Sequence, residues 1–228
     1  MIARGGAGGI RIAPSVLAAD LARLAEQVQA VLEGGADWLH VDVMDGRFVP
    51  NLTFGANMVA TLRRLTDKPI DVHLMVVEPE RYIEPMADAG ASVLTFHPEA
   101  TVHVQRQLAS IRERGMLAGL ALNPAAPFAL VEEVVVDIDL LLIMTVNPGF
   151  GGQRYVPAST DKIRRARALL AARRAPAFLE VDGGIGVDTI ADAHAAGADT
   201  FVAGQAVFGS TDPAREVGEL RRRCAVSV

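Results

Sequence analysis

Histidine and aspartate alternate with apolar residues in two short segments of the sequence. Residues 40–44 read His-Val-Asp-Val-Met, and residues 71–75 read Asp-Val-His-Leu-Met. Alternate residues of a β-strand share a face, so His40 and Asp42 would point the same way, and His73 would point the same way in its own strand. A charged side chain on an inward strand face is costly unless it is paired or coordinated. Both segments are therefore candidates for a functional site.

A third segment, Glu180-Val181-Asp182-Gly183-Gly184, also places an aspartate where an apolar run ends. If all three segments are strands that end at one edge, four side chains converge there: His40, Asp42, His73 and Asp182. A lone strand histidine is more often a hydrogen-bonded core residue than a ligand. Two imidazoles and two carboxylates at the same edge favour a divalent metal site instead. Such an ion would polarise a ketone and stabilise the enediolate that forms after loss of an α-proton.

The two carboxylates predict a specific proton chemistry. A single base tends to return a proton to the face that it left, whereas two carboxylates on opposite faces can remove a proton from one side and deliver one to the other. That exchange inverts the carbon. Asp42 and Asp182 are therefore the predicted proton carriers, each binding the metal through one oxygen and moving a proton through the other.

Glycine-rich loops supply the second half of the predicted site. The sequence Asn147-Pro148-Gly149-Phe150-Gly151-Gly152 follows one apolar run, and Gly183-Gly184 and Gly204-Gln205 follow the next two. Glycines let backbone N–H groups approach a phosphate closely, and loops at this place in a barrel commonly bind one. Tight turns alone would explain one such pair. Three consecutive loops favour a phosphate site.

Other side chains near the same edge have less specific interpretations. Met44, Met75 and Met144 could form an apolar wall that excludes water from the reacting carbon, although methionine is more often a flexible core residue. Ser15 could bind a substrate hydroxyl or cap the following turn. His97 could support a ligand or be structural. His103 and His194 fall on predicted helices and are expected at the surface.

The elements that must position these residues alternate along the whole chain. Amphipathic helical stretches, such as 21–32, 102–114 and 161–173, separate short β-rich runs, and a Gly-Ala-Asp or Gly-Ala-Ser junction recurs at residues 35, 90 and 197, where glycine suits a helix C-cap. Eight strands are predicted, at 10–13, 38–43, 70–75, 93–96, 117–122, 140–146, 177–181 and 200–202. Eight such units in 228 residues favour an α/β fold of the closed (β/α)8 TIM-barrel type in a single domain. An open doubly wound sheet would need a G-x-G-x-x-G turn after the first strand, where Ser15-Val16-Leu17 stands. Residues 1–9 are glycine-rich and are predicted to be a flexible N-terminal tail, with the barrel at 10–228.

Composition excludes several classes of protein. No apolar run reaches the ~18 residues of a membrane helix, and the N-terminus lacks a secretory signal. The net charge is −5, and no basic run is interleaved with aromatic residues, so neither nucleic acid nor membrane is an expected partner. A single cysteine, Cys224, allows no internal disulfide and fits the reducing cytoplasm.

These motifs closely resemble the ribulose-phosphate 3-epimerase family over nearly the whole chain. The matching segments are 12–20 (IAPSVLAAD), 40–46 (HVDVMDG), 49–53 (VPNLT), 71–76 (DVHLMV), 95–99 (TFHPE), 144–153 (MTVNPGFGGQ), 181–184 (VDGG) and 201–204 (FVAG).

The resemblance implies an isomerase that interconverts D-ribulose 5-phosphate and D-xylulose 5-phosphate in pentose phosphate metabolism, with one divalent ion per subunit and a homo-oligomeric state. It implies His40, Asp42, His73 and Asp182 as metal ligands, with Asp42 and Asp182 exchanging the roles of proton acceptor and donor. Zinc is the first expectation for the ion, and iron(II), manganese and cobalt also suit the ligand set. Substrate contacts would come from Ser15, His73, Gly149, Phe150, Gly151, Gly152, Asp182, Gly183, Gly184, Gly204 and Gln205. One departure is Gln205, which stands where the family pattern has serine and could alter phosphate affinity or the length of sugar accepted.

Three rival functions remain to be weighed. A 3-epimerase of another ketose phosphate, such as allulose 6-phosphate, would use the same site. A Schiff-base aldolase needs a lysine at the barrel mouth, but Lys68 precedes the third strand and Lys162 falls on a helix, which argues against it. A non-catalytic sugar-phosphate binding barrel would not need both aspartates.

Overall fold

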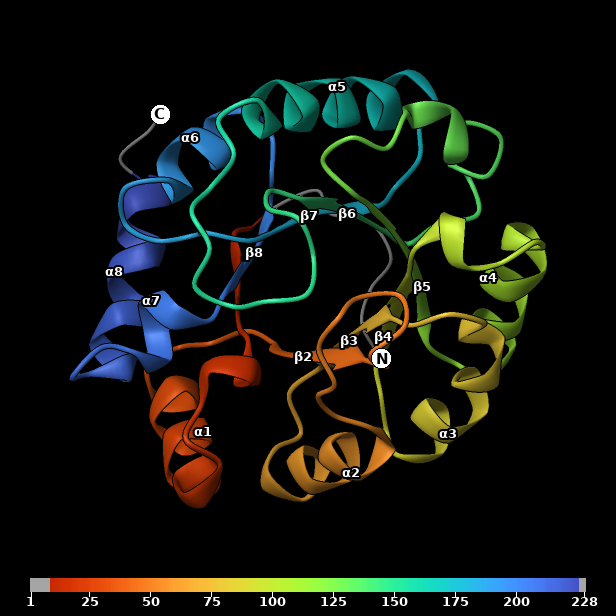
Figure 1. Cartoon of the computed structure of the whole chain (residues 1–228). Coiled ribbons are helices and arrows are strands. Elements are labelled where there is room, and N and C mark those ends of the chain that lie inside the picture. The colour runs from red at the N-terminus through yellow and green to blue at the C-terminus, as the bar shows by residue number, and fades with distance from the viewer. Residues whose placement is uncertain (1–8, 226–228) are drawn as a thin grey trace.

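The computed structural model describes residues 9–225, so most of the predicted N-terminal tail lies outside the described residues. Eight parallel strands form one sheet in the order β1-β8-β7-β6-β5-β4-β3-β2, and they line the inner ring seen in Figure 1. Their bounds are β1 Arg11–Pro14, β2 Leu39–Met44, β3 Ile70–Met75, β4 Val93–Phe96, β5 Leu117–Leu122, β6 Leu140–Met144, β7 Phe178–Asp182 and β8 Thr200–Ala203. The predicted strands and the predicted (β/α)8 barrel are therefore confirmed, with strand ends displaced by at most two residues.

The barrel closes where the first and second strands meet. A parallel bridge joins Ser15 to His40, and the carbonyl of Ile12 accepts a hydrogen bond from the N–H of Asp37 at 3.0 Å. This closure brings the ends of β1 and β2 together beside one mouth of the barrel.

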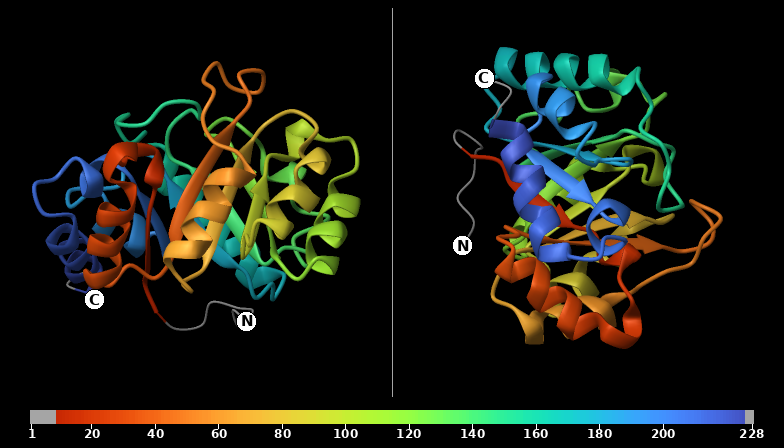
Figure 2. Two further views of the ribbon diagram at one scale, coloured as in Figure 1. Left: turned by 90° about the horizontal axis from the view of Figure 1, so that it is seen from below. Right: turned by 90° about the vertical axis from the view of Figure 1, so that its left-hand side faces the viewer.

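Helices surround the strands and bury their outer faces, as the two views in Figure 2 show. They are α1 Leu24–Glu33, α2 Ala56–Leu65, α3 Ile83–Asp88, α4 Val104–Glu113, α5 Ser159–Ala172, α6 Ile190–Ala195, α7 Gln205–Phe208 and α8 Pro213–Ala225. Within residues 9–225, no helix is long and apolar enough to cross a bilayer.

The connection between β5 and β6 differs from a regular βα unit. It contains a 3₁₀ turn at Phe128–Leu130 followed by further turns, with no α-helix. Pro124 and Pro127 cannot donate backbone hydrogen bonds, and the β-branched run 134–136 disfavours a helix. The regular alternation predicted from the sequence is interrupted at this one connection among the described residues.

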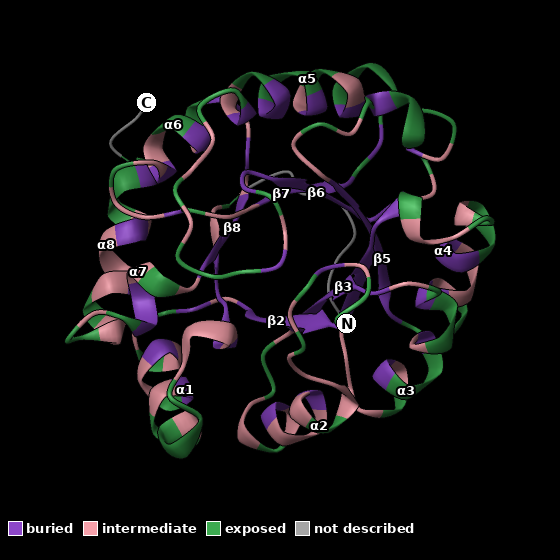
Figure 3. Cartoon of the chain, in the orientation of Figure 1, coloured by how far each residue is buried: buried purple, intermediate pink, exposed green. Residues whose placement is uncertain are grey.

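Alternation along the strands separates two apolar layers, and every strand is buried almost throughout (Figure 3). Leu39, Val41 and Val43 of β2 belong to the large cluster between the sheet and the helices. The barrel interior is filled by a second cluster that includes Trp38 and Phe178, whose rings meet edge-to-face at 5.3 Å between centroids. This interior packing leaves the polar face of β2 pointing into the barrel, as the alternation predicted.

A repeated side-chain clamp explains the recurring Gly-Ala-Asp/Ser junction. The glycines at 35, 90 and 197 have φ of +91°, +95° and +111°, which confirms their predicted place just after a helix. At each junction the polar residue two positions after the glycine accepts a hydrogen bond from an N–H within the first two residues of the preceding odd-numbered strand, and it contacts an arginine from a helix. Asp139, which follows no such glycine, forms a fourth set of the same kind. The four sets are Asp37 with Ile12 and Arg221, Ser92 with Ile70 and Arg63, Asp139 with Ala118 and Arg112, and Asp199 with Leu179 and Arg167. These clamps tie helices to the amino ends of the strands, opposite the mouth that holds the predicted chemistry.

Candidate active site

Three strands bring the predicted ligand residues to the carboxyl end of the barrel. The register pairs Asp42 of β2 with His73 of β3, and Asp182 is the last residue of β7. His40 lies one inward position deeper on β2. Parallel strands end at the same edge, so residues separated by more than a hundred positions in the sequence share one small volume.

The geometry of the four side chains fits a divalent ion. One ligand atom from each of His40, Asp42, His73 and Asp182 lies within 4.8 Å of all the others. Asp42 Oδ1 lies 3.3 Å from both His40 Nε2 and His73 Nδ1, and His73 Nδ1 lies 4.0 Å from Asp182 Oδ2. Tetrahedral ligands at ~2.1 Å from a metal lie about 3.4 Å from one another, so the two 3.3 Å separations match neighbouring ligands, whereas the 4.0 Å separation is wider. The cluster could therefore hold a metal ion.

A carboxylate behind His40 fixes the direction of that imidazole. Asp71 Oδ2 lies 2.6 Å from His40 Nδ1, and both residues are fully buried. A hydrogen bond from Nδ1–H to Asp71 leaves the lone pair on Nε2, which faces the cluster. Asp71 shares an inward face with His73, but the sequence pattern alone did not indicate this role for it.

The two oxygens of Asp42 have different partners. Oδ1 faces the two histidines, whereas Oδ2 accepts a 2.6 Å hydrogen bond from the hydroxyl of Ser15. Ser15 Oγ also accepts a longer bond, 3.3 Å, from the N–H of Leu17 at the start of a 3₁₀ turn, so the predicted turn cap is present. One carboxylate oxygen is thus available to the ligand cluster while the other is held beside the cavity.

The two predicted proton carriers are in different electrostatic states. Burial opposes ionisation of Asp42, but its interactions with His40 and His73 lower its pKa well below the ordinary range. Burial, and next the charge of Asp42, raises the pKa of Asp182 to about 6. One carboxyl is therefore ionised while its neighbour holds a proton more readily, which is the asymmetry that a two-carboxyl proton transfer requires.

A further carboxyl group lies deeper in the barrel. Glu180 is fully buried on β7, and neither of its oxygens has a hydrogen-bond partner within 9–225. Burial, and next repulsion from Asp71, raises the pKa of Glu180 well above its usual value. The raised pKa favours the protonated form of Glu180, which would place no second negative charge beside Asp71.

His97 lies directly behind His73. The two Nε2 atoms are 2.9 Å apart, and the His97 ring packs between the rings of His73 and Phe48. Burial, and next the charge of His73, lowers the pKa of His97 well below its usual value, so this imidazole is neutral. Of the two interpretations that the sequence allowed, the contact favours support of a ligand residue.

Above the cluster, the mouth encloses a cavity of about 560 Å³. Its deep wall includes Ser15, Asp42, Asp182 and the predicted methionines Met44, Met75 and Met144. Its rim includes the predicted loop residues Gly149, Phe150, Gly151, Gly152, Gly183, Gly184, Gly204 and Gln205. His40 and His73 are fully buried, and neither is among the residues that line the cavity, although His73 was a predicted substrate contact.

Two glycines at the rim are required by the packing of the loops. Gly183 has a φ of +117°, and a Cβ there would lie 2.4 Å from Val146 Cγ2. Gly184 has a φ of +65°, and a Cβ would lie 2.3 Å from the backbone nitrogen of Tyr155. The loop after β7 thus packs directly on the loop after β6, and only glycine allows this approach.

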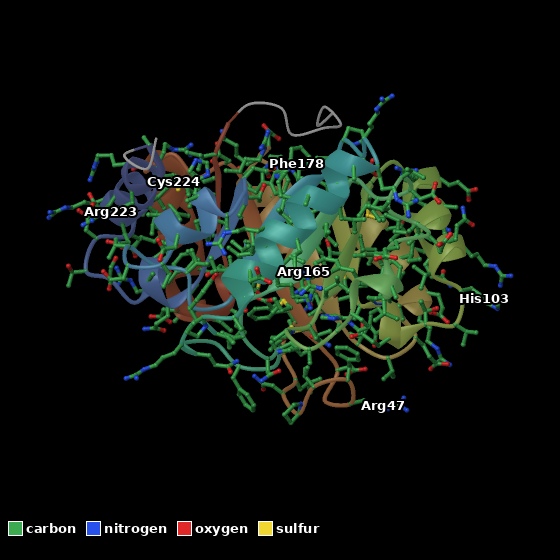
Figure 4. All side chains as sticks on the ribbon, turned by 90° about the horizontal axis from the view of Figure 1, so that it is seen from above. Arg47, His103, Arg165, Phe178, Arg223 and Cys224 are labelled. Carbon is green, nitrogen blue, oxygen red and sulfur yellow. The ribbon has the colours of Figure 1, made fainter. Side chains whose placement is uncertain are left out.

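The second loop over the mouth follows β2. Residues 45–55 project away from the barrel in Figure 2, and Arg47 marks their exposed tip in Figure 4. A Cβ on Gly149 would lie 3.3 Å from Val49, so the β2 loop touches the glycine-rich loop after β6. Phe150 is 58% exposed beside this contact.

The remaining residues named from the sequence lie away from the cavity. Lys68 is exposed before β3, and Lys162 on α5 donates to the carbonyls of Asn123, Pro124 and Ala126. Neither lysine is among the residues that line the cavity. His103 is exposed, as expected, at the outer edge of the molecule in Figure 4. It lies just before α4 and not on it. His194 lies on α6, as predicted, and is half-buried, with its Nδ1 3.0 Å from the carbonyl of Ala198 at the following junction.

Solved structures share the architecture of this chain at low sequence identity. A 3-hexulose-6-phosphate synthase from Salmonella typhimurium matches with a TM-score of 0.71 and 16% identity, over 96% of this chain and 100% of that one. A protein named KGPDC from Streptococcus mutans has the same TM-score and identity, over 96% and 99% of the two chains. These likenesses support the barrel fold alone.

Curated relatives are far more similar in sequence than these solved structures. Ribulose-phosphate 3-epimerase 1 of Cupriavidus necator is 51% identical over 207 residues, which cover 89% of this chain and 86% of that protein. Ribulose-phosphate 3-epimerases of Mycobacterium tuberculosis and Escherichia coli are 48% and 47% identical, over 98% and 94% of this chain and 96% of each relative. Residues 11–208 match the model of the ribulose-phosphate 3 epimerase family. The chain therefore belongs to the ribulose-phosphate 3-epimerase family.

Proposed function

We propose that this chain, an epimerase of carbohydrate metabolism by its family, inverts C3 of D-ribulose 5-phosphate to give D-xylulose 5-phosphate and catalyses the reverse reaction. The observation that carries the proposal is the pair of carboxyl groups, Asp42 from β2 and Asp182 from β7, that line one cavity next to a four-ligand cluster. The names of the relatives support a ribulose phosphate substrate.

The proposed proton transfer uses the two carboxyl groups in sequence. Ionised Asp42 removes the proton from C3, and the electron pair of the broken C–H bond moves toward the C2 carbonyl to give an enediolate. The carboxyl proton of Asp182 is then delivered to the opposite face of C3. One turnover leaves the proton on Asp42, which is the state required for the reverse direction.

The protein environment supports each of these steps. The hydroxyl of Ser15 holds Asp42 Oδ2 in place, and the methionines 44, 75 and 144 present apolar surface around the reacting carbon. Glycine-rich loops at 149–152, 183–184 and 204–205 surround the other end of the cavity, where backbone N–H groups would bind the phosphate. We propose Ser15 as a further contact to a substrate hydroxyl.

We also propose that His40, Asp42, His73 and Asp182 hold one divalent ion, with zinc as the first expectation. Two nitrogen and two oxygen ligands also suit iron(II), manganese and cobalt. Such an ion would supply positive charge that polarises the ketone and stabilises the enediolate.

Isotope labelling tests the proton transfer directly. In D2O, the wild-type enzyme should place deuterium at C3 of the product, which proton NMR detects. Asp42→Asn and Asp182→Asn should each lower kcat by about 10²–10⁴-fold, because each removes one proton carrier. Asp161→Asn, on the exposed surface of α5, is the matched control and should be fully active. Turnover without deuterium at C3 would contradict a two-carboxyl mechanism.

Substrate choice and assembly need separate measurements. Comparing kcat/KM for D-ribulose 5-phosphate and D-allulose 6-phosphate would decide between five-carbon and six-carbon ketose phosphates. We expect a cytoplasmic homo-oligomer by resemblance to the family, and light scattering of the purified protein would measure its mass in solution.

A further inference from the structure

His97 is a fully buried histidine that stands outside the four-ligand cluster and contacts one of its members. It follows β4 and is the cap residue of a 3₁₀ turn at Pro98–Ala100. Its ring centroid lies 5.0 Å from that of His73 and 4.8 Å from that of Phe48. The packing on both sides confines the His97 ring to one orientation.

The short contact between the two imidazoles requires a defined proton arrangement. His97 Nε2 and His73 Nε2 lie 2.9 Å apart, which is a hydrogen-bond distance, so one of the two nitrogens must donate and the other accept. On the opposite side of its ring, His73 directs Nδ1 toward Asp42 and Asp182, at 3.3 and 4.0 Å. A nitrogen that binds a metal must present a lone pair, so a neutral His73 carries its hydrogen on Nε2. His97 then accepts that hydrogen bond.

We propose that His97 is a positioning residue that fixes the tautomer and ring orientation of His73 and so prepares His73 Nδ1 to bind a divalent cation. The inference rests on the metal site of the proposed function and assigns a role to a residue outside it. Ligand histidines generally donate their second N–H to an acceptor that orients them.

His40, the other ligand histidine, also has a hydrogen-bond acceptor behind its ring, but that acceptor is a carboxylate. His40 Nδ1 contacts the carboxylate of Asp71 at 2.6 Å, whereas His73 Nε2 contacts Nε2 of the His97 imidazole at 2.9 Å. Both ligand histidines thus have an acceptor behind them, and together these acceptors aim one nitrogen of each ring into the cluster.

The unused nitrogen of His97 supports this role over simple packing. His97 Nδ1 is buried and has no hydrogen-bond partner within residues 9–225. A buried polar atom without a partner is unfavourable, and a phenylalanine would fill a similar volume without it. Histidine at this position is therefore explained by the contact that Nε2 makes with His73.

Zinc affinity of matched variants tests the proposal. His97→Phe removes the acceptor and should weaken zinc binding about 10–100-fold, measured by competition with a chromogenic chelator. His97→Gln can place an amide oxygen near the position of Nε2 and should bind zinc within about threefold of wild type. His103→Phe, which alters an exposed histidine, controls for loss of an imidazole and should match wild type. Circular dichroism of each metal-free variant verifies folding.

Nitrogen NMR of the zinc-loaded wild-type enzyme gives a readout that needs no substitution. With ¹⁵N-labelled histidine, the proton in the His73–His97 contact should reside on His73 Nε2. A proton on His97 Nε2, or unchanged zinc affinity in His97→Phe, would overturn the proposal. So would a His97→Gln variant that folds but binds zinc as weakly as His97→Phe. If His97→Phe does not fold, the glutamine variant and the NMR measurement decide. Failure of the wild-type enzyme itself to bind zinc would refute the metal site instead.

Discussion

Replacing Ser15 with alanine should separate proton transfer from metal binding. The Ser15 hydroxyl donates a 2.6 Å hydrogen bond to Asp42 Oδ2, while Asp42 Oδ1 faces the two ligand histidines. The substitution therefore removes the partner of the oxygen beside the cavity and leaves the oxygen that faces the cluster untouched.

The geometry sets the size of the expected effect. A hydrogen bond to a charged group contributes about 1.5–3 kcal/mol. Ser15 and Asp42 are both buried, at 4% exposure each, so water cannot replace the lost donor freely. If the bond is kept in the transition state, its loss lowers kcat/KM by about 10–150-fold, because 1.36 kcal/mol corresponds to a factor of ten. The cap to Leu17, at 3.3 Å, is long and should add little.

The assay couples xylulose 5-phosphate formation to a dehydrogenase and runs beside a zinc titration. Ser15→Ala should lose activity while its zinc Kd stays within about threefold of wild type. Ser210→Ala is the control, because its hydroxyl bonds only the local carbonyl of Val207 among the described residues. Activity within threefold of wild type would refute the role of Ser15. If Ser15→Ala lost zinc to an extent that explained its loss of activity, the separate roles of Asp42 Oδ1 in metal binding and Oδ2 in proton transfer would be refuted.

Three further outcomes are expected. Gly184→Ala should raise KM at least tenfold and lower the melting temperature, because its Cβ would collide with the backbone of Tyr155. A Cβ on Gly151 meets nothing closer than 3.9 Å, so Gly151→Ala should keep the melting temperature of wild type. Equal melting temperatures of the two variants would contradict the packing argument. Asp199→Ala should reduce the free energy of unfolding by about 2–4 kcal/mol in urea titrations. The substitution leaves the N–H of Leu179 without its side-chain acceptor and removes the charged partner of Arg167. A change below about 0.5 kcal/mol would show that the clamp is dispensable. Chelation should abolish epimerase activity and added zinc should restore it, whereas full activity in a sample shown by elemental analysis to be metal-free would exclude a metal-dependent reaction.

The sequence was sufficient for the features that depend on local periodicity. Strand alternation placed His40, Asp42 and His73 on inward faces, and glycines after β6, β7 and β8 located the loops of the rim. The barrel followed from eight repeated units, and their junction glycines adopt the positive φ that was predicted. These features could be predicted because the period of a strand and the conformational needs of a turn are properties of a few consecutive residues.

The absence of an α-helix between β5 and β6 could not be predicted from local periodicity. Alternating strands and helices predict a regular unit there, but two prolines and a β-branched run produced turns instead. The half-buried position of His194 is a similar case, because its partner is the backbone carbonyl of the following junction. Both outcomes depend on how a segment packs against the barrel, which periodicity does not specify.

The partners of the site residues were decided only by the tertiary structure. The hydrogen bonds between Ser15 and Asp42, between His40 and Asp71 and between His73 and His97 join residues that are 27, 31 and 24 positions apart. Each depends on the register between neighbouring strands and on closure of β1 against β2, since a slip of one residue would turn every inward side chain outward. The sequence thus determined which residue types face the mouth. The folded barrel determined which oxygen or ring nitrogen of each is left free to act.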